Sequence, residues 1–197
     1  MTFGKLEFSV PRWLEAALPD PDRRFDGPEE RMALAVELAR RNVRRETGGP
    51  FGAAVFERET GELVAPGVNL VVRGRCSVLH AEMVALMLAQ RALGSHDLAA
   101  PGLPECELVS SAEPCAMCFG ALPWSGVARL VCGARSSDAR EVGFDEGEKP
   151  SEWTAALERR GVEVLRDVQR DEAVSVLRSY AEGGGPIYNS RRNAGGD

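Results

Sequence analysis

The sequence predicts an α/β domain in which helices and strands alternate along the chain and pack in layers. Short apolar runs bounded by Gly and Pro alternate with longer segments whose apolar residues recur at helical spacing. The chain has 197 residues, which suits one domain with a full hydrophobic core. Its hydrophobic content of 44% and charged content of 27% are those of an ordinary globular protein. We find neither an internal repeat nor a domain linker.

The first predicted elements are an N-terminal extension and a long helix. Residues 1–25 form the extension, with a short helix near 11–18 that Pro19 and Pro21 end. The long helix is predicted to start at residues 26–28, because acidic residues follow there, and to end at Gly48. Its apolar face consists of Met32, Ala35, Val36, Ala39 and Val43.

The middle of the chain reads as a hairpin followed by a helix that is apolar on most sides, as a buried helix is. We expect Pro66 and Gly67 to interrupt the second strand of the hairpin. The predicted elements are a strand at 51–56, a turn at 59–62, a strand at 63–72, a polar loop at 73–77 and a helix at 79–93.

The remaining strands and helices complete a domain that we place at residues 26–182. After it, residues 183–197 form a Gly-rich tail that predicts no regular structure. The elements are a strand at 105–111, a helix directly after it, a strand at 129–133, a polar loop at 136–148, a helix at 151–160, a strand at 162–165 and a helix at 172–182.

Charge and composition narrow the classes of partner. The net charge is −6, whereas proteins that grip nucleic acid usually carry a basic face, so the balance argues against a tRNA or DNA substrate. The basic cluster of Arg40, Arg41, Arg44 and Arg45 is interpreted as a solvated helix end, with a phosphate site as the alternative. No apolar run suggests a membrane span and no signal peptide is recognised. Five cysteines, an odd number, favour a reducing cytoplasm over a disulfide framework.

Two short motifs carry the chemistry. His80 stands two positions before Glu82, and Cys115 and Cys118 form a C-x-x-C pair directly after a proline. One imidazole and two thiolates hold one Zn²⁺ and leave a fourth position for water, as in catalytic zinc sites. The combined pattern is typical of zinc-dependent nucleobase deaminases. The alternatives are a thioredoxin-like redox pair, or a core histidine with buried cysteines.

The chemistry expected of these residues is hydrolysis at a ring carbon that bears an amino group. Zinc lowers the pKa of bound water toward roughly 7, so zinc-bound hydroxide is available at neutral pH. Glu82 is the candidate that carries protons from the attacking water to the ring and to the departing amine. Unpaired backbone N–H groups near residues 113–115 are candidate donors to the substrate.

Residues 31–148 resemble the cytidine-deaminase-like superfamily, and within it the bacterial guanine deaminase and nucleoside deaminase branch. The resemblance rests on both zinc motifs, on Gly49 to Ala53, on Asn69 and on the segment Val142 to Glu146. That last segment is similar to the Gly-Phe-Asp-acid loop of guanine deaminases, which implies a second proton-carrying carboxylate at Glu146. A glutamate at this position, the longer chain and the segment before His80 depart from the family pattern.

The resemblance implies a three-layer α/β/α fold around a five-stranded mixed sheet, in a homodimer. It implies one catalytic zinc ion on His80, Cys115 and Cys118, with Glu82 and Glu146 as proton carriers. The candidate substrate-binding residues are Asn69, Phe51, Ala81, Trp124, Asp145 and Tyr188. Asn69 is otherwise a strand-end turn residue, Trp124 a core residue and Glu146 a solvated loop acid.

The expected reaction is conversion of a free purine, guanine to xanthine plus ammonia, in a cytoplasmic enzyme. Other small aminated heterocycles or nucleosides, such as guanosine and cytosine, remain alternatives, and so does adenosine in tRNA. A non-enzymatic alternative is a zinc-stabilised scaffold, which has no use for the free carboxylate of Glu82.

Overall fold

The computed structural model describes residues 7–16, 18, 20 and 22–189, and its centre is a five-stranded sheet in the order β2-β1-β3-β4-β5. The pairs β1–β2 and β1–β3 are antiparallel, whereas β3–β4 and β4–β5 are parallel. The prediction of a mixed sheet is therefore confirmed. The strands are β1 (Gly52–Glu57), β2 (Leu63–Val68), β3 (Cys106–Ala112), β4 (Arg129–Ala134) and β5 (Glu163–Leu165).

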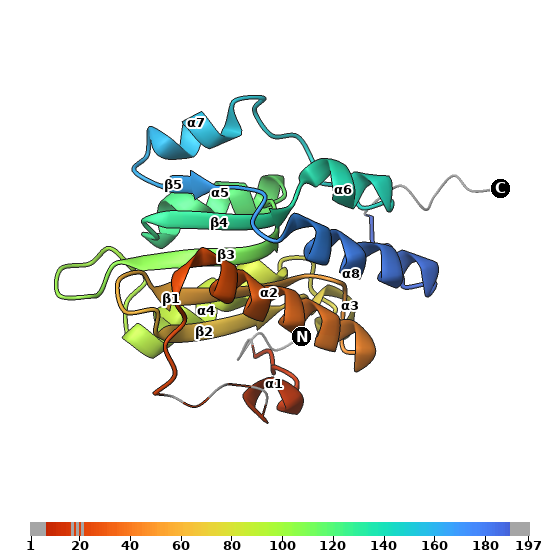
Figure 1. Ribbon diagram of the computed structural model, residues 1–197, viewed down its shortest axis with the longest axis horizontal. Helices are drawn as coiled ribbons and strands as arrows, with labels where there is room; N and C mark the ends of the chain where they lie inside the picture. Colours follow the sequence, from red (N-terminus) through yellow and green to blue (C-terminus); the bar gives the residue numbers. More distant parts are fainter. Residues whose placement is uncertain (1–6, 17, 19, 21, 190–197) are drawn as a thin grey trace, which may run out of the picture.

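Helices cover both faces of this sheet and give three layers (Figure 1). Helices α2 and α8 pack on one face, and α4 and α5 lie behind the other face (Figure 1). The helices are α1 (Arg12–Ala16), α2 (Gly27–Arg44), α3 (Val71–Gly74), α4 (Ala81–Leu93), α5 (Ala116–Ser125), α6 (Ser136–Glu141), α7 (Trp153–Glu158) and α8 (Arg170–Glu182). The predicted three-layer α/β/α architecture is confirmed.

Strand β3 lies at the centre of the core, and every one of its residues is buried. Apolar clusters form on both of its faces, one with α2 and α8 and the other with α4. Gly67 in β2 allows α4 to pack closely, because a Cβ at this position would lie 2.2 Å from the Ala81 carbonyl oxygen. This contact fixes the start of α4 directly over β2, and His80 immediately precedes that start.

The strand predicted at 63–72 differs from the structure in two respects. The second strand ends at Val68, and Val71–Gly74, predicted as the end of the strand and the start of a polar loop, forms a short helix. The Asn69 Oδ1 atom accepts a hydrogen bond from the Val71 amide at 3.3 Å at the start of this helix. Pro66 does not interrupt the strand, since β2 is an edge strand, where a missing N–H is tolerated.

The segment predicted as a polar loop at 136–148 begins with the short helix α6. The Arg135 amide donates to Asp138 Oδ2 at 2.8 Å, and Arg170 donates to both oxygens of the same carboxylate at 2.9 and 2.7 Å. These contacts to α8 stabilise a helix that has no periodic apolar face. The other predicted elements are present, with ends that move by a few residues.

The N-terminal segment is attached to the domain by side chains of α1. Leu14 is buried, and the Trp13 indole donates to Thr47 Oγ1 at 3.0 Å. Residues 190–197 of the predicted tail lie outside the described residues. Among the residues described, none of the helices combines the length and hydrophobicity that spanning a bilayer requires.

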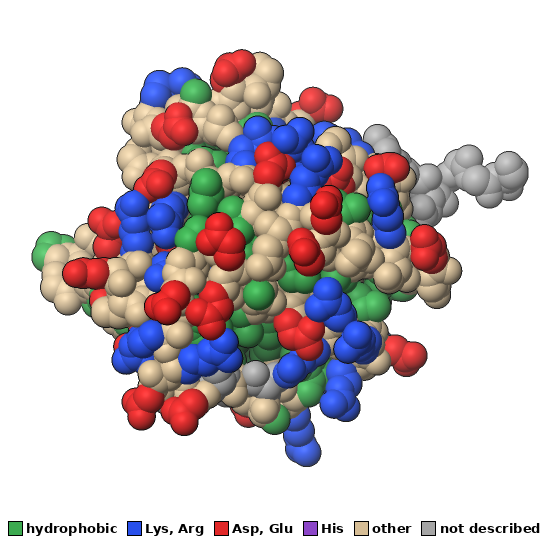
Figure 2. Space-filling view, in the orientation of Figure 1, with side chains coloured by type: hydrophobic (Ala, Val, Ile, Leu, Met, Phe, Trp, Pro, Cys, Tyr) green, Lys and Arg blue, Asp and Glu red, His purple; other side chains and the backbone are tan. Residues whose placement is uncertain are grey.

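Acidic and basic side chains alternate over the face that α2 and α8 cover (Figure 2). Within the arginine cluster, Arg40 and Arg41 both donate to the Glu37 carboxylate, at 3.0 and 2.7 Å. These two arginines therefore have an acidic partner on their own helix, as expected of a solvated helix end.

A buried ion cluster joins α2 to the sheet at the start of β3. Glu107 is fully buried, and its carboxylate accepts hydrogen bonds from Arg31 at 2.6 Å and from Arg129 at 2.5 Å. Arg31 also donates to the Phe25 carbonyl oxygen at 3.0 Å. Replacing one partner of such a cluster leaves the other charges buried without compensation.

We expect Glu107→Met to lower the free energy of unfolding by about 3–5 kcal/mol, because it leaves two arginines without their carboxylate. Chemical denaturation measures this change. The matched control is Glu105→Gln, which removes an exposed partner of Arg58 and is expected to change stability by less than about 1 kcal/mol. Equal effects of the two substitutions would contradict a stabilising role for the buried cluster.

Candidate zinc-dependent active site

The candidate metal ligands occupy the first positions of two helices. His80 is the N-cap of α4 and Cys115 the N-cap of α5, both with extended backbone dihedrals, and Cys118 lies in the first turn of α5. An N-cap side chain usually accepts a hydrogen bond from the helix backbone. Neither His80 nor Cys115 does so, and both side chains turn toward a common point instead.

The geometry of these side chains fits zinc. Cys115 Sγ lies 3.4 Å and Cys118 Sγ lies 3.7 Å from His80 Nδ1, and the three ligand atoms all lie within 4.8 Å of one another. Tetrahedral zinc at its usual bond lengths separates N and S ligands by about 3.5–3.8 Å. One imidazole and two thiols thus form an open three-ligand zinc site, as predicted.

The surroundings favour a thiolate at Cys115. A hydrogen bond with Cys118 and the neighbouring His80 ring lower the pKa of Cys115 to about 4, against the opposing effect of burial. The positive end of the α5 dipole acts in the same direction. A thiolate is the form of cysteine that binds metal, so the site is prepared for a cation.

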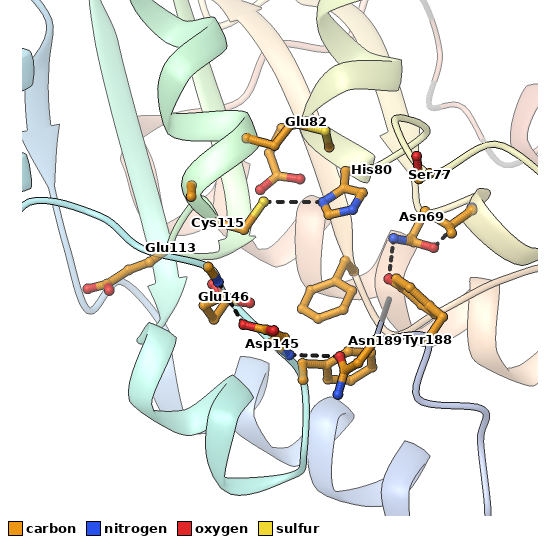
Figure 3. Close-up of a pocket in the computed structure, with 16 residues that line it drawn as sticks. Asn69, Ser77, His80, Glu82, Glu113, Cys115, Asp145, Glu146, Tyr188 and Asn189 are labelled. Carbon is orange, nitrogen blue, oxygen red and sulfur yellow. Dashed lines mark hydrogen bonds between the residues drawn. The ribbon is translucent and has the colours of Figure 1, made fainter. Parts of the chain in front are cut away.

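Glu82 lies beside the ligands in the first turn of α4 and is only 6% exposed. Figure 3 shows its carboxylate turned toward the Cys115 sulfur. Burial, followed by the negative charge of Cys115, raises the pKa of Glu82. A carboxyl group with a raised pKa next to a metal site can accept a proton and return it.

A second carboxylate, that of Glu146, enters the cavity on the other side of Cys115 (Figure 3). Its loop is attached to α5, because the Ala116 amide donates to the Glu146 carbonyl oxygen at 2.9 Å. Burial, followed by the charge of Cys115, raises the pKa of Glu146 to about 7. Asp145, its neighbour, donates its amide to Asn189 Oδ1 at 2.9 Å.

An amide and an aromatic wall face these acids across the cavity (Figure 3). Asn69 Nδ2 donates to the Tyr188 hydroxyl at 2.5 Å. The ring of Phe144 contacts those of Phe51 and Tyr188 with centroid distances of 4.9 and 5.5 Å. Such a pocket offers a planar heterocycle both ring contacts and directional hydrogen bonds.

Asn69 is held by a buried partner that the sequence did not reveal. Asn42 Nδ2 donates to the backbone carbonyl oxygens of Asn69 and Gly49, each at 2.9 Å. Gly48 leaves room for this contact, since a Cβ there would lie 1.8 Å from the Asn69 carbonyl oxygen. Only the structure brings Asn42, which reads as a helix residue, next to Asn69.

The structure brings most of the predicted site residues to one cavity of about 340 Å³. Its lining also includes residues that the sequence reasoning missed, namely Val71, Ser77, Met117 and Asn189. The predicted residues that line it are Phe51, Asn69, His80, Glu82, Cys115, Asp145, Glu146 and Tyr188.

Two predicted substrate-binding residues do not line this cavity. Ala81 is fully buried, because its backbone packs against Gly67. Trp124 is 79% exposed near the end of α5, one to two helical turns beyond Cys118, and therefore faces solvent in the single chain. The expectation that Trp124 packs around the ring is wrong for this chain alone, and so is the alternative that it fills the core.

Comparison with known proteins identifies the family to which this site belongs. Residues 27–134 match the cytidine and deoxycytidylate deaminase zinc-binding region. The chain belongs to the cytidine and deoxycytidylate deaminase family. The matched residues cover more than half of the chain and include all three ligands. His80, Cys115 and Cys118 of this deaminase chain are in position to bind a metal ion, and that ion is zinc.

Similar proteins point to one branch of the family. Guanine deaminase from Bacillus subtilis is 36% identical over 127 residues, which cover 61% of this chain and 77% of that protein. The structure of a guanine deaminase from Nitrosomonas europaea is 52% identical, with a TM-score of 0.87 over 90% of this chain and 97% of that chain. The structure of NE0047 with 2,6-diaminopurine is 53% identical, with a TM-score of 0.87 over 94% and 97%.

We expect Cys115→Ala to lose bound zinc and to lower the melting temperature, because metal binding is coupled to folding. Elemental analysis of the purified variant and thermal denaturation measure both effects. Cys76→Ala is the control, since Cys76 lies outside the ligand cluster. Stoichiometric zinc in the Cys115→Ala variant would contradict the ligand assignment.

Proposed function

We propose that this chain is a zinc-dependent guanine deaminase, which converts guanine and water to xanthine and ammonia. The observation that carries the proposal is the ligand set of His80, Cys115 and Cys118 beside a cavity that is lined by two buried carboxylates, Glu82 and Glu146. The relatives described above are guanine deaminases, and a purine, 2,6-diaminopurine, is bound in the NE0047 structure.

The reaction forms a C–O bond and breaks a C–N bond at the ring carbon that carries the amino group. When bound, zinc supplies a Lewis acid that lowers the pKa of water. Glu82 accepts a proton from the attacking water and donates one to the ring nitrogen. Glu146, from the opposite side of Cys115, moves the second proton of that water from the added hydroxyl group to the amino group, which leaves as ammonia. The raised pKa values of both carboxyl groups suit them to this repeated exchange.

The remaining residues of the cavity orient the purine. The Asn69 side chain offers one donor and one acceptor to a base edge, while Phe51 and Tyr188 contact its ring. Asp145 is an exposed residue of the cavity lining next to Asn189, and we propose that it contacts the base from this side. The cavity is small, and the acidic net charge of −6 favours a free base over tRNA as the substrate.

We also propose the limits of the deaminase domain and the compartment of the protein. Residues 26–182 form the deaminase domain. The segment before it contacts the domain through the hydrogen bond from Trp13 to Thr47. The tail reaches the cavity through Tyr188, whose hydroxyl accepts a hydrogen bond from Asn69. None of the five cysteines forms a disulfide, and a zinc site needs its cysteines reduced, so we place the enzyme in the cytoplasm.

A homodimer accounts for the exposure of Trp124. Helix α5 contains no charged residue, and Met117, Gly120, Ala121 and Trp124 follow one another at the spacing of a helix face. A Cβ at Gly120 would meet no atom within 4 Å, so the helix surface is open there. We propose that α5 of a second copy covers this face, since a symmetric contact buries the same apolar residues twice.

The substrate assignment is tested by ammonia release from guanine, guanosine, cytosine, adenine and small triazines. We expect zinc-loaded protein to turn over guanine fastest, with xanthine as the second product. The Glu82→Gln variant keeps the size of the side chain but cannot accept a proton, so its kcat should fall by about 100- to 10,000-fold.

Glu172→Gln serves as the control for Glu82→Gln, because Glu172 is an exposed residue of α8, outside the cavity. Its activity should equal that of the wild type. No turnover of any compound by the zinc-loaded wild type would refute the deaminase. Unchanged activity of Glu82→Gln would refute the role of that carboxylate.

The dimer is tested by light scattering on a size-exclusion column. We expect the wild type to show twice the 21.3 kDa mass of the chain and Trp124→Glu to show one chain mass, because a charge replaces the apolar centre of the contact. Leu18→Glu, which alters an exposed apolar side chain elsewhere, should remain dimeric. A monomeric wild type would refute the dimer, and a dimeric Trp124→Glu variant would refute this interface.

A further inference from the structure

Behind Glu146, two side chains that do not line the cavity form a hydrogen-bonded chain. The Ser136 hydroxyl donates to Glu146 Oε2 at 3.2 Å, and Lys149 Nζ donates to Ser136 Oγ at 2.7 Å. Ser136 and Glu146 are both buried, with 5% and 6% exposure, so water does not readily replace these contacts. The chain of contacts thus joins a cavity carboxylate to an ammonium group outside the cavity.

The direction of these hydrogen bonds follows from the chemistry of the groups. An ammonium group has three donors and no acceptor, so Ser136 Oγ must accept from Lys149. The hydroxyl hydrogen of Ser136 then remains for Glu146. In addition, the Ser136 amide donates to Glu113 Oε2 at 3.0 Å, which holds the backbone of Ser136 in place. Ser136 therefore presents its hydrogen to Glu146 in one defined orientation.

Lys149 is itself held on several sides. Its ammonium group donates to the Pro114 carbonyl oxygen at 2.6 Å and lies 4.7 Å from the centre of the Trp153 ring. The nearby Glu113 carboxylate is already bound by Arg166, at 2.7 Å. The Lys149 charge therefore acts on two buried carboxylates, that of Glu113 and, across Ser136, that of Glu146. Such pairing is what a buried charge requires.

We propose that Ser136 and Lys149 are positioning residues for Glu146: they hold Oε2 from behind, so that Oε1 is the oxygen presented to the bound base. This inference rests on the proposed function, in which Glu146 transfers a proton. A carboxylate on a loop needs such support, because a helix fixes Glu82 but nothing in regular secondary structure fixes Glu146. Orientation of a proton carrier affects the rate of the chemical step more than the binding of substrate.

The alternative is that Ser136 and Lys149 only stabilise the loop at residues 142–149. In that case their replacement would lower thermal stability, and any loss of activity would not depend on the Glu146 carboxylate. A double-mutant cycle separates the two explanations, because coupling between residues appears as non-additive effects. Zinc content and melting temperature are measured for every variant.

We expect Ser136→Ala to lower kcat on guanine by about 5- to 50-fold with KM within about 2-fold of the wild type, a size typical of coupled contacts. Lys149→Met should have an effect of the same kind, while Ser136→Thr and Lys149→Arg, which keep the hydroxyl and the charge, should recover part of the rate. In a Glu146→Gln background, Ser136→Ala should cause no further loss. Ser137→Ala, at the exposed neighbouring position, is the matched control and should match the wild type.

Three results would overturn the inference. The first is a zinc-loaded, folded Ser136→Ala or Lys149→Met variant with the kcat of the wild type. The second is a full additional loss of kcat in the Glu146→Gln background, and the third is a loss confined to KM. If Ser136→Ala does not fold, Lys149→Met, at a partly exposed position, decides the question. Absence of turnover by the wild type would instead refute the proposed function itself.

Discussion

The convergence of two helix starts is the constraint on which the site depends. His80 and Cys115 each stand directly before the first residue of a helix. Their side chains meet because α4 and α5 begin near each other, at the same end of the strands. The close contact of α4 with Gly67 sets one of these starts, and the fully buried strand β3 leads to the other. A shift of either helix by one residue would rotate its ligand by about 100° about the helix axis, and the three metal ligands would no longer converge.

The two carboxylates of the cavity are positioned by different means. Glu82 belongs to a buried helix, so its place follows from the packing of α4 against the sheet. Glu146 belongs to a loop, whose backbone is attached to α5 through Ala116 and whose turns use Gly143 and Gly147 at positive φ. Rigid secondary structure thus supports one of these carboxylates, and a network of specific hydrogen bonds supports the other.

Local spacing explains which parts of the molecule the sequence predicted. The three metal ligands lie in short motifs, and the strands and the longer helices have clear apolar periodicity, so these predictions are confirmed. The short helix α6 has no such periodicity and depends on Arg170 of α8, a contact that only the fold creates. The prediction for Trp124 is wrong because an apolar residue in a helical segment can lie either in the core or on the exposed face, and the sequence does not distinguish the two. The roles of Asn69 and Glu146 and the domain limits remain predictions.

Strand β3 connects a region that stabilises the fold with a region that borders the cavity. Near its start, Glu107 joins two arginines in a cluster that the fold needs, and just beyond its end, Glu113 and Cys115 border the cavity. Six residues of extended chain separate Glu107 from Glu113, or about 20 Å. Side chains around the cavity can therefore change during evolution without disturbing the ionic anchor at the far end. This separation gives the scaffold the freedom to diversify toward new heterocycles while its architecture persists.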